Sequence, residues 1–128
     1  MPRPTVVRTE SAPAPFQGAP YSQAIRSGDF VFVSGQLGLK TGDTEISGTI
    51  QEQTEQIFRN LRGILEEAGS GLDRIVKTTV FLRDMGEFAD MNAVYAEFFR
   101  LAPPARATVE AARLPRDVSI EIDCIAVI

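Results

Sequence analysis

The C-terminal segment VSIEIDCIAVI, residues 118–128, is the feature that most constrains how this chain can fold. Its even-numbered positions are all apolar, so one face of a strand here can pack against helices. Its odd-numbered positions begin with Ser119, Glu121 and Asp123 and end with two apolar residues, so the opposite face is mixed. The earlier segment DFVFVSGQL, residues 29–37, is apolar on both faces. Together these strands predict a sheet that needs cover on both sides.

Two helices are available to provide that cover. Residues 49–68 have apolar side chains at three- and four-residue spacing, with Thr49 and Glu52 placed as a capping box and Gly69 as a stop. A second helix is predicted before the Pro103–Pro104 pair. Its apolar face consists of Phe88, Met91, Tyr95 and Phe98.

The remaining segments complete an α+β domain that spans residues 1–128. Strands are predicted at 74–84 and 106–111, and Gly42 is expected in a turn. Residues 1–20 are rich in proline and predict an irregular wrap, with a short edge strand at 5–7 and no regular structure elsewhere in residues 1–10. A length of 128 residues suits one domain.

Two helices can cover only one face of a sheet. The other face carries too many apolar side chains to be left in water, so subunits are expected to pack sheet against sheet. The sequence therefore predicts an oligomer.

The composition argues against several classes of partner. The formal net charge is −4 and the pI is about 4.8, so a nucleic acid is not an expected partner. The longest apolar run, 124–128, is far too short to span a bilayer, and the N-terminus lacks a signal sequence. A single cysteine, Cys124, allows no internal disulfide and is expected to be an inert core thiol. A cytoplasmic location is predicted.

The chain has no histidine. This removes Ser-His-Asp hydrolysis, Cys-His nucleophiles and most zinc sites together. The acidic residues show no spacing typical of a metal site, so no metal is predicted. Any chemistry must use carboxylates, tyrosine, arginine, backbone groups and water.

Arg106 is the first candidate, because the segment PPARATVE places it where a loop enters a strand. It is interpreted either as a rim arginine that snorkels or pairs with a surface carboxylate, or as a guanidinium that binds a substrate carboxylate in a cleft. Glu121 and Asp123 share one strand face and are either a polar strip at a subunit rim or an acid–base pair.

Three further residues have weaker signals. Tyr21 is interpreted as a packed tyrosine or a site residue. Gly35, after Ser34 at the end of an apolar strand, indicates a bulge or a ligand close to the backbone. Asn92 lies one step off the apolar face of its helix, where exposure is common.

Five segments, taken in order from about residue 10 to the C-terminus, resemble the reactive intermediate deaminase family, also called Rid or YjgF. They are GAPYSQAI, VFVSGQL, IVKTTVFLRDMGEFADMNAVYAEFF, PARATVEAARLP and VSIEIDCIAV. The resemblance implies a chorismate-mutase-like fold with a single mixed sheet and two helices on one face. It also implies a homotrimer with clefts between subunits.

The same resemblance implies an activity that needs no cofactor. It implies a hydrolase of the 2-iminobutanoate/2-iminopropanoate deaminase type, which converts enamines and imines such as 2-aminoacrylate to 2-oxo acids and ammonia. Pyridoxal-phosphate-dependent dehydratases would supply these intermediates. By motif position, Arg106 would bind the substrate carboxylate and Glu121 would activate water or move a proton. The cleft would be lined or ordered by Tyr21, Ser34, Gly35, Asn92 and the backbone at Thr108.

The chain departs from the family pattern at two places. Thr108 stands where well-known members have a cysteine, and the lead-in FQGAP before Tyr21 is longer than in some members. Alternative functions are a non-catalytic trimer that binds small metabolites in a regulatory or holdase-like role, and an aminoacrylate deaminase of a specialised catabolic pathway. Ribonuclease activity is disfavoured by the acidic pI, and chorismate mutase activity would rest on fold alone.

Overall fold

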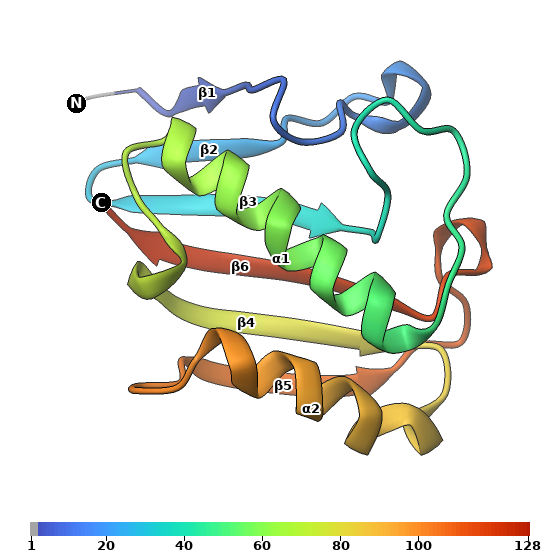
Figure 1. Ribbon diagram of the computed structural model, residues 1–128. Helices are drawn as coiled ribbons and strands as arrows, with labels where there is room; N and C mark the ends of the chain where they lie inside the picture. The colour runs from blue at the N-terminus through green and yellow to red at the C-terminus, as the bar shows by residue number, and fades with distance from the viewer. Residues whose placement is uncertain (1–2) are drawn as a thin grey trace.

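In the computed structural model, which describes residues 3–128, six strands form one mixed sheet in the order β1-β2-β3-β6-β4-β5 (Figure 1). Only β4 and β5 are parallel neighbours. Two helices, α1 and α2, lie on the same face of the sheet (Figure 1). The predicted α+β fold with helices on one face is therefore confirmed. The strands are β1 (Thr5–Val7), β2 (Ala24–Ser27), β3 (Phe30–Gln36), β4 (Ile75–Leu82), β5 (Ala105–Glu110) and β6 (Ile120–Val127).

Helix α1 (Ile50–Glu67) begins and ends where the sequence predicts. The Thr49 hydroxyl accepts the Glu52 N–H, and the Glu52 carboxylate accepts the Thr49 N–H. Such a cap contributes about 1 kcal/mol to stability. At the other end Gly69 has φ +86, and the Ser70 N–H donates to the Leu65 carbonyl, which closes the helix. Helix α2 (Phe88–Phe98) follows a single turn, Met85–Glu87.

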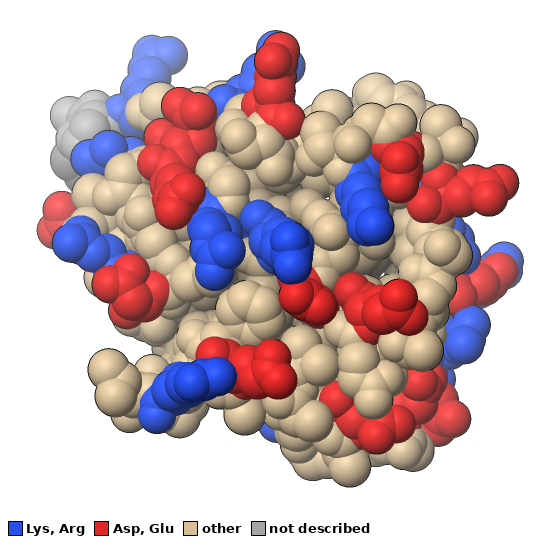
Figure 2. All heavy atoms as spheres, viewed as in Figure 1, with Lys and Arg blue, Asp and Glu red and all other residues tan. Residues whose placement is uncertain are grey.

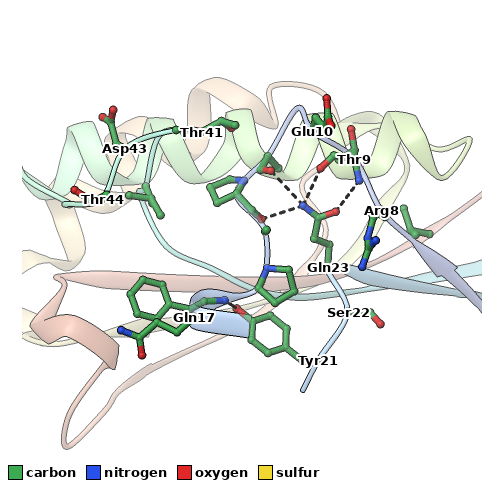
Figure 3. A pocket seen from close by; sticks show the side chains of 18 of the residues that line it. Arg8, Thr9, Glu10, Gln17, Tyr21, Ser22, Gln23, Thr41, Asp43 and Thr44 are labelled. Atoms are coloured by element: carbon green, nitrogen blue, oxygen red, sulfur yellow. Dashed lines mark hydrogen bonds between the residues drawn. The ribbon is translucent and has the colours of Figure 1, made fainter. Parts of the chain in front are cut away.

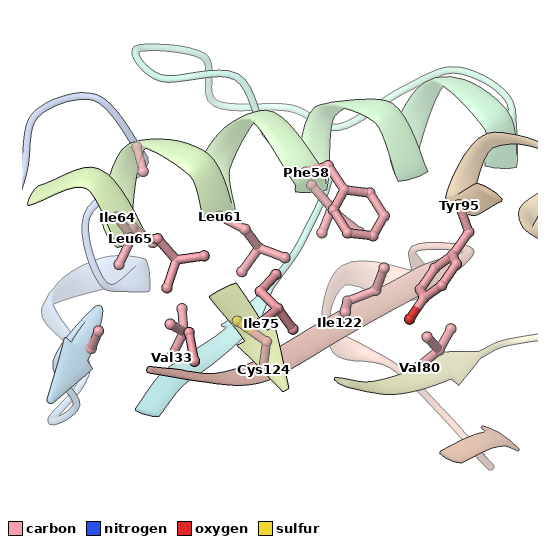
Figure 4. Close-up of a cluster of buried hydrophobic side chains, with 14 of the residues drawn as sticks. Val33, Phe58, Leu61, Ile64, Leu65, Ile75, Val80, Tyr95, Ile122 and Cys124 are labelled. Atoms are coloured by element: carbon pink, nitrogen blue, oxygen red, sulfur yellow. The ribbon is translucent and has the colours of Figure 1, made fainter. Parts of the chain in front are cut away.

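The core lies between the two helices and the sheet (Figure 4). Leu61, Ile64 and Phe58 of α1 are fully buried against β6 and β4, which contribute Ile122 and Val80. Tyr95 and Met91 are the buried residues of α2, whereas Phe88 is 38% exposed and Phe98 only half-buried. The predicted apolar face of α2 is thus buried at its centre and partly open at both ends.

The far face of the sheet carries no helix (Figure 1). Along β6, buried and half-buried positions alternate as the sequence predicts. Along β3, Val31 and Val33 are buried, while Phe30 and Phe32 are 45% and 46% exposed. We call this uncovered side the open face. Its aromatic residues are more exposed than a single chain normally leaves them.

Strand β2 is the element that the sequence prediction missed. It is only four residues long, and it pairs with β1 on one side and β3 on the other. A two-residue turn, Gly28–Asp29, joins it to β3, and Gly28 has φ +58. A Gly-Asp pair before an apolar strand is a hairpin signal, so the sequence did contain the information. The N-terminal wrap is consequently tied into the sheet.

The other differences are small. The strand predicted at 5–7 matches β1, and the one predicted at 106–111 is shifted by one residue from β5. The other three predicted strands, 29–37, 74–84 and 118–128, are two or three residues longer than β3, β4 and β6, because their flanking residues turn before the ladder ends. Ser119, expected to lie on the open face, precedes β6 and is 8% exposed. Its N–H donates to the Gln53 side chain of α1. Gly42 has φ +90, as a turn residue should.

Acidic and basic side chains alternate over the helix-bearing face, with no broad basic area on the side that Figure 2 shows. Within residues 3–128, no helix is both long and apolar enough to cross a membrane. Cys124 is a buried free thiol, and burial raises its pKa to about 12. The prediction of an inert core cysteine is confirmed.

Candidate functional site

Arg106 lies near the start of β5 and points toward α2, on the helix-bearing side of the sheet. One guanidinium nitrogen donates to the Asn92 side-chain oxygen at 2.8 Å. The guanidinium carbon lies 4.6 Å from the centre of the Tyr95 ring and 5.5 Å from that of Phe88. Arg106 is half-buried and has no carboxylate partner within residues 3–128. The structure therefore gives no support to the ion-pair form of the rim-arginine interpretation.

A cavity of about 370 Å³ lies beside Arg106. Residues of α2 form one wall, and the two prolines that precede β5 form another. The lining residues are Asn92, Tyr95, Ala96, Phe99, Pro103, Pro104 and Arg106. A cationic fork at the edge of a partly apolar cavity is suited to hold a small carboxylate.

Thr108 lies two residues after Arg106, at the position that faces Val80 in the β4–β5 pair. Its hydroxyl oxygen is buried and has no hydrogen-bond partner within residues 3–128. A buried hydroxyl without a partner is unusual and costs free energy. The Thr108 hydroxyl can therefore form a hydrogen bond for which residues 3–128 supply no partner.

Glu121 occupies the middle of β6 and points to the open face, because Ile120 and Ile122 on either side are fully buried under the helices. Its carboxylate fills the space next to Gly35 of β3. A Cβ atom at Gly35 would overlap the Glu121 carboxylate. The register of the β3–β6 pair shifts between Val33 and Gln36, so Gly35 lies within a bulge. The predicted bulge is thus confirmed.

Burial raises the pKa of Glu121, and the nearby Asp123 carboxylate raises it further. The two acids share a face, as their spacing predicts. A carboxyl whose pKa lies above its usual range is better able to accept and return a proton near neutral pH. Glu121 therefore combines a raised pKa with a place in the middle of the open face.

Tyr21 and Ser34 border the same end of the open face, near η1 (Phe16–Gly18). The Tyr21 hydroxyl accepts the Phe16 N–H at 2.9 Å, and the Ser34 hydroxyl donates to the Ser22 carbonyl at 2.6 Å. Ser34 thus orders the segment that carries Tyr21. Tyr21 is 45% exposed. We call residues 12–22, the segment that leads into β2, the lip.

Gln23 is a residue that the sequence prediction missed (Figure 3). Its buried amide accepts the Thr9 N–H and donates to three carbonyls of the N-terminal segment, those of Thr9, Ala12 and Pro13. These bonds hold one wall of a cavity of about 990 Å³ between the N-terminal segment and the 39–44 loop. A glutamine between two apolar strands gave no sequence signal for this clamp, because its partners are backbone atoms.

The seven sequence-predicted site residues therefore form two groups. Arg106, Asn92 and Thr108 lie on the helix-bearing side, next to β5. Glu121, Gly35, Ser34 and Tyr21 lie on or beside the open face. Strand β4 separates the two groups, because it pairs with β5 through Thr78 and Arg106 and with β6 through Phe81 and Glu121. One chain does not bring Arg106 and Glu121 together.

Comparisons with known proteins agree with this fold. A family model described as endoribonuclease L-PSP matches residues 9–128. A RutC family protein of Pyrococcus horikoshii is 50% identical over 123 residues, which cover 94% of this chain and 95% of that protein. The chloroplastic Reactive Intermediate Deaminase A of Arabidopsis thaliana is 45% identical, over 94% of this chain and 64% of that protein.

A solved structure, that of Escherichia coli TdcF with bound serine, superposes with a TM-score of 0.91 at 37% identity, over 97% of this chain and 98% of that one. A matched family model and relatives of this identity over nearly the whole chain define the class. The chain belongs to the endoribonuclease L-PSP family, which is the YjgF/Rid family that the sequence segments resemble. Because one relative is chloroplastic, the cytoplasmic location stays a prediction.

Proposed function

We propose that this protein is a deaminase that hydrolyses 2-imino acids and their enamine tautomers to 2-oxo acids and ammonia without a cofactor. The substrates are of the 2-aminoacrylate, 2-iminopropanoate and 2-iminobutanoate type. The observation that carries the proposal is the pair of half-sites: an arginine beside a cavity and without a carboxylate partner in residues 3–128 at one edge, and a carboxyl of raised pKa on the open face. The name of the Arabidopsis relative supports the reaction class.

The two half-sites meet if the β5 edge of one copy, which carries Arg106, lies against the open face of its neighbour, which carries Glu121. The exposed residues Phe30 and Phe32, with Val76 and Val109, favour such packing. In a closed homotrimer, the Arg106 edge of one copy lies against the Glu121 region of its neighbour, and each interface forms one complete site. The serine in the structure of E. coli TdcF supports a small amino-acid-like ligand in this family.

The chemistry needs little from the protein. The substrate carboxylate binds Arg106, which leaves the C2 carbon of the protonated imine open to attack. Glu121 takes a proton from water as the C–O bond forms and returns it to the nitrogen of the resulting carbinolamine. The C–N bond then breaks as the carbinol oxygen forms the C=O bond, and the hydroxyl proton leaves with ammonia as ammonium. The products are one 2-oxo acid and one ammonia for each imine and water. Holding the imine and an oriented water together supplies most of the acceleration.

The test couples the purified protein to a threonine or serine dehydratase and follows the release of the 2-oxo acid. The wild-type chain should shorten the lifetime of the imine. Arg106→Ala should fold normally and lose about 3 kcal/mol of transition-state binding, roughly a 100-fold fall in kcat/KM, because Arg106 is only half-buried. Circular dichroism and the oligomeric state serve as controls. Equal rates with and without wild-type protein would contradict the proposal.

The non-catalytic alternative keeps the carboxylate site but has no use for a proton-transfer group. The raised pKa of Glu121 favours the enzyme, because a simple binding site gains nothing from an acid held on an apolar face. Ribonuclease activity is disfavoured by the formal net charge of −4, which on average repels a phosphate backbone.

A further inference from the structure

We propose that Tyr95 is a positioning residue, whose ring acts as a rigid support that orients the Arg106 guanidinium to bind a carboxylate. This inference rests on the proposed function and adds a residue to it. Tyr95 touches the arginine and not the reacting atoms, so it would act through Arg106 alone.

The support consists of one face of α2. Phe88, Asn92 and Tyr95 recur at spacings of four and three residues, so all three side chains lie on the same side of the helix. Asn92 fixes one nitrogen of Arg106 by a hydrogen bond of 2.8 Å, while the Tyr95 ring lies 4.6 Å from the guanidinium carbon. A hydrogen bond at one nitrogen and a ring against the carbon together restrict how the planar group can rotate.

The Tyr95 ring is itself held tightly (Figure 4). It is 6% exposed, and its hydroxyl forms a buried hydrogen bond of 2.7 Å with the Thr78 hydroxyl of β4. Its ring centre lies 5.5 Å from that of Phe58 of α1, in an edge-on arrangement, and 4.8 Å from that of Phe99, in a tilted one. The packing of the two helices is therefore transmitted through Tyr95 to Arg106.

The interaction is between a cation and a neutral ring. Burial raises the pKa of the Tyr95 hydroxyl, so the phenol keeps its proton at working pH. A phenolate or a carboxylate in this place would compete with the substrate for the positive charge. A neutral aromatic face orients the guanidinium and leaves its charge available. Both residues line the cavity of about 370 Å³, which is where a bound carboxylate would be placed.

Removing the ring should weaken carboxylate binding with little effect on the chemical step. For Tyr95→Leu we expect KM for the imine, and Kd for the product 2-oxobutanoate by calorimetry, to rise about 5- to 30-fold. The value of kcat should stay within about twofold, because the lost interaction is present in both the ground and transition states. Tyr95→Phe, which keeps the ring and loses the bond to Thr78, should remain close to wild type.

Phe98→Leu is the matched control. Phe98 stacks on Phe58 at 4.6 Å in the same aromatic cluster, but its ring is not among those that face Arg106. This variant should lose stability and keep carboxylate affinity. The inference is overturned if Tyr95→Leu binds 2-oxobutanoate as wild type does, or if Phe98→Leu weakens binding equally.

A readout that needs no catalysis separates this inference from the proposed function. In the free protein, NMR should show the Arg106 Nε–Hε signal shifted by the ring current of Tyr95, in Tyr95→Phe also. In Tyr95→Leu this part of the shift should be lost, and only the smaller part from the more distant Phe88 ring should remain. An unshifted wild-type signal would overturn the inference even if the deaminase is active. A shifted signal in a protein without deaminase activity would overturn the proposed function and leave the geometry of Tyr95 and Arg106 supported.

Discussion

The edge beneath α2 and the open face hold their functional side chains in different ways. Arg106 is fixed by a hydrogen bond to Asn92 and by two aromatic rings, of which Tyr95 is packed into the core and Phe88 is partly exposed. Glu121 has no such supports; its carboxylate occupies space that is available because Gly35 has no side chain. The lip beyond it is held mainly by hydrogen bonds to the backbone.

This difference indicates a division of work. A group that binds a carboxylate gains from rigidity, because a fixed fork loses little entropy on binding. A group that moves a proton gains from a raised pKa, which burial on an apolar face supplies without a fixed partner. Within one chain, β4 separates Arg106 from Glu121, and the proposed assembly of subunits would bring the two side chains together.

The largest effect is expected on the open face, from Glu121→Gln. The amide keeps the size and hydrogen-bonding capacity of the side chain but cannot accept a proton from water. We expect kcat to fall by about 100- to 10,000-fold, with KM nearly unchanged. Steady-state kinetics with the dehydratase-coupled assay measures this split. A variant that lost affinity and kept kcat would show that the two regions do not divide the work in this way.

Gly35→Ala should have a smaller effect on the same side. The added methyl group would overlap the Glu121 carboxylate, which can rotate away because it is half-exposed. The carboxylate is then present but displaced, so we expect kcat to fall about tenfold with little loss of stability. Thermal unfolding and turnover measure the two quantities. Wild-type turnover in Gly35→Ala would mean that the position of Glu121 beside the bulge is irrelevant.

The smallest effect concerns stability and pH. Since the folded chain raises the pKa of Glu121, the folded state binds more protons than the unfolded state as pH rises through the unfolded pKa. The contribution of Glu121 to stability is present at acid pH and is lost as pH rises through its folded pKa. Glutamine does not titrate, so Glu121→Gln does not lose this stability as pH rises. The free energy of unfolding of the variant, compared with that of wild type, should therefore be more favourable at neutral than at acid pH. Because the carboxyl is half-exposed, the change should be less than about 1 kcal/mol.

Urea titrations at the two pH values and one fixed protein concentration test this point. A difference between variant and wild type that does not change with pH would mean that Glu121 titrates normally. It would also remove the electrostatic reason for assigning proton transfer to the open face.

The sequence predicted the elements whose periodicity is strong. The cap at Thr49, the alternation along β6 and the two apolar faces of β3 all follow from local spacing. Strand β2 was missed because four residues of mixed polarity have no clear period, although Gly28–Asp29 marked the hairpin. Local signals thus set most of the fold.

The site was harder to predict, because proximity in the folded chain depends on which side of the sheet a residue faces. Arg106 and Glu121 were interpreted as one cleft, and nothing local shows that β4 lies between them. Tyr95 was correctly predicted as a core residue, yet its contact with Arg106 depends on how α2 crosses β5. The sequence signal that could have indicated this contact is that Tyr95 follows Asn92 by three residues, which places both on the same side of α2.

The most direct test of the two-region account mixes two inactive variants. Arg106→Ala keeps the proton-transfer half-site, and Glu121→Gln keeps the carboxylate-binding half-site. If each site combines Arg106 of one copy with Glu121 of its neighbour, refolding an equal mixture should restore about a quarter of wild-type activity, because random assembly joins two intact halves at that frequency. Deaminase activity no higher than that of the separate variants, in an assembly shown to contain both chains, would contradict the account.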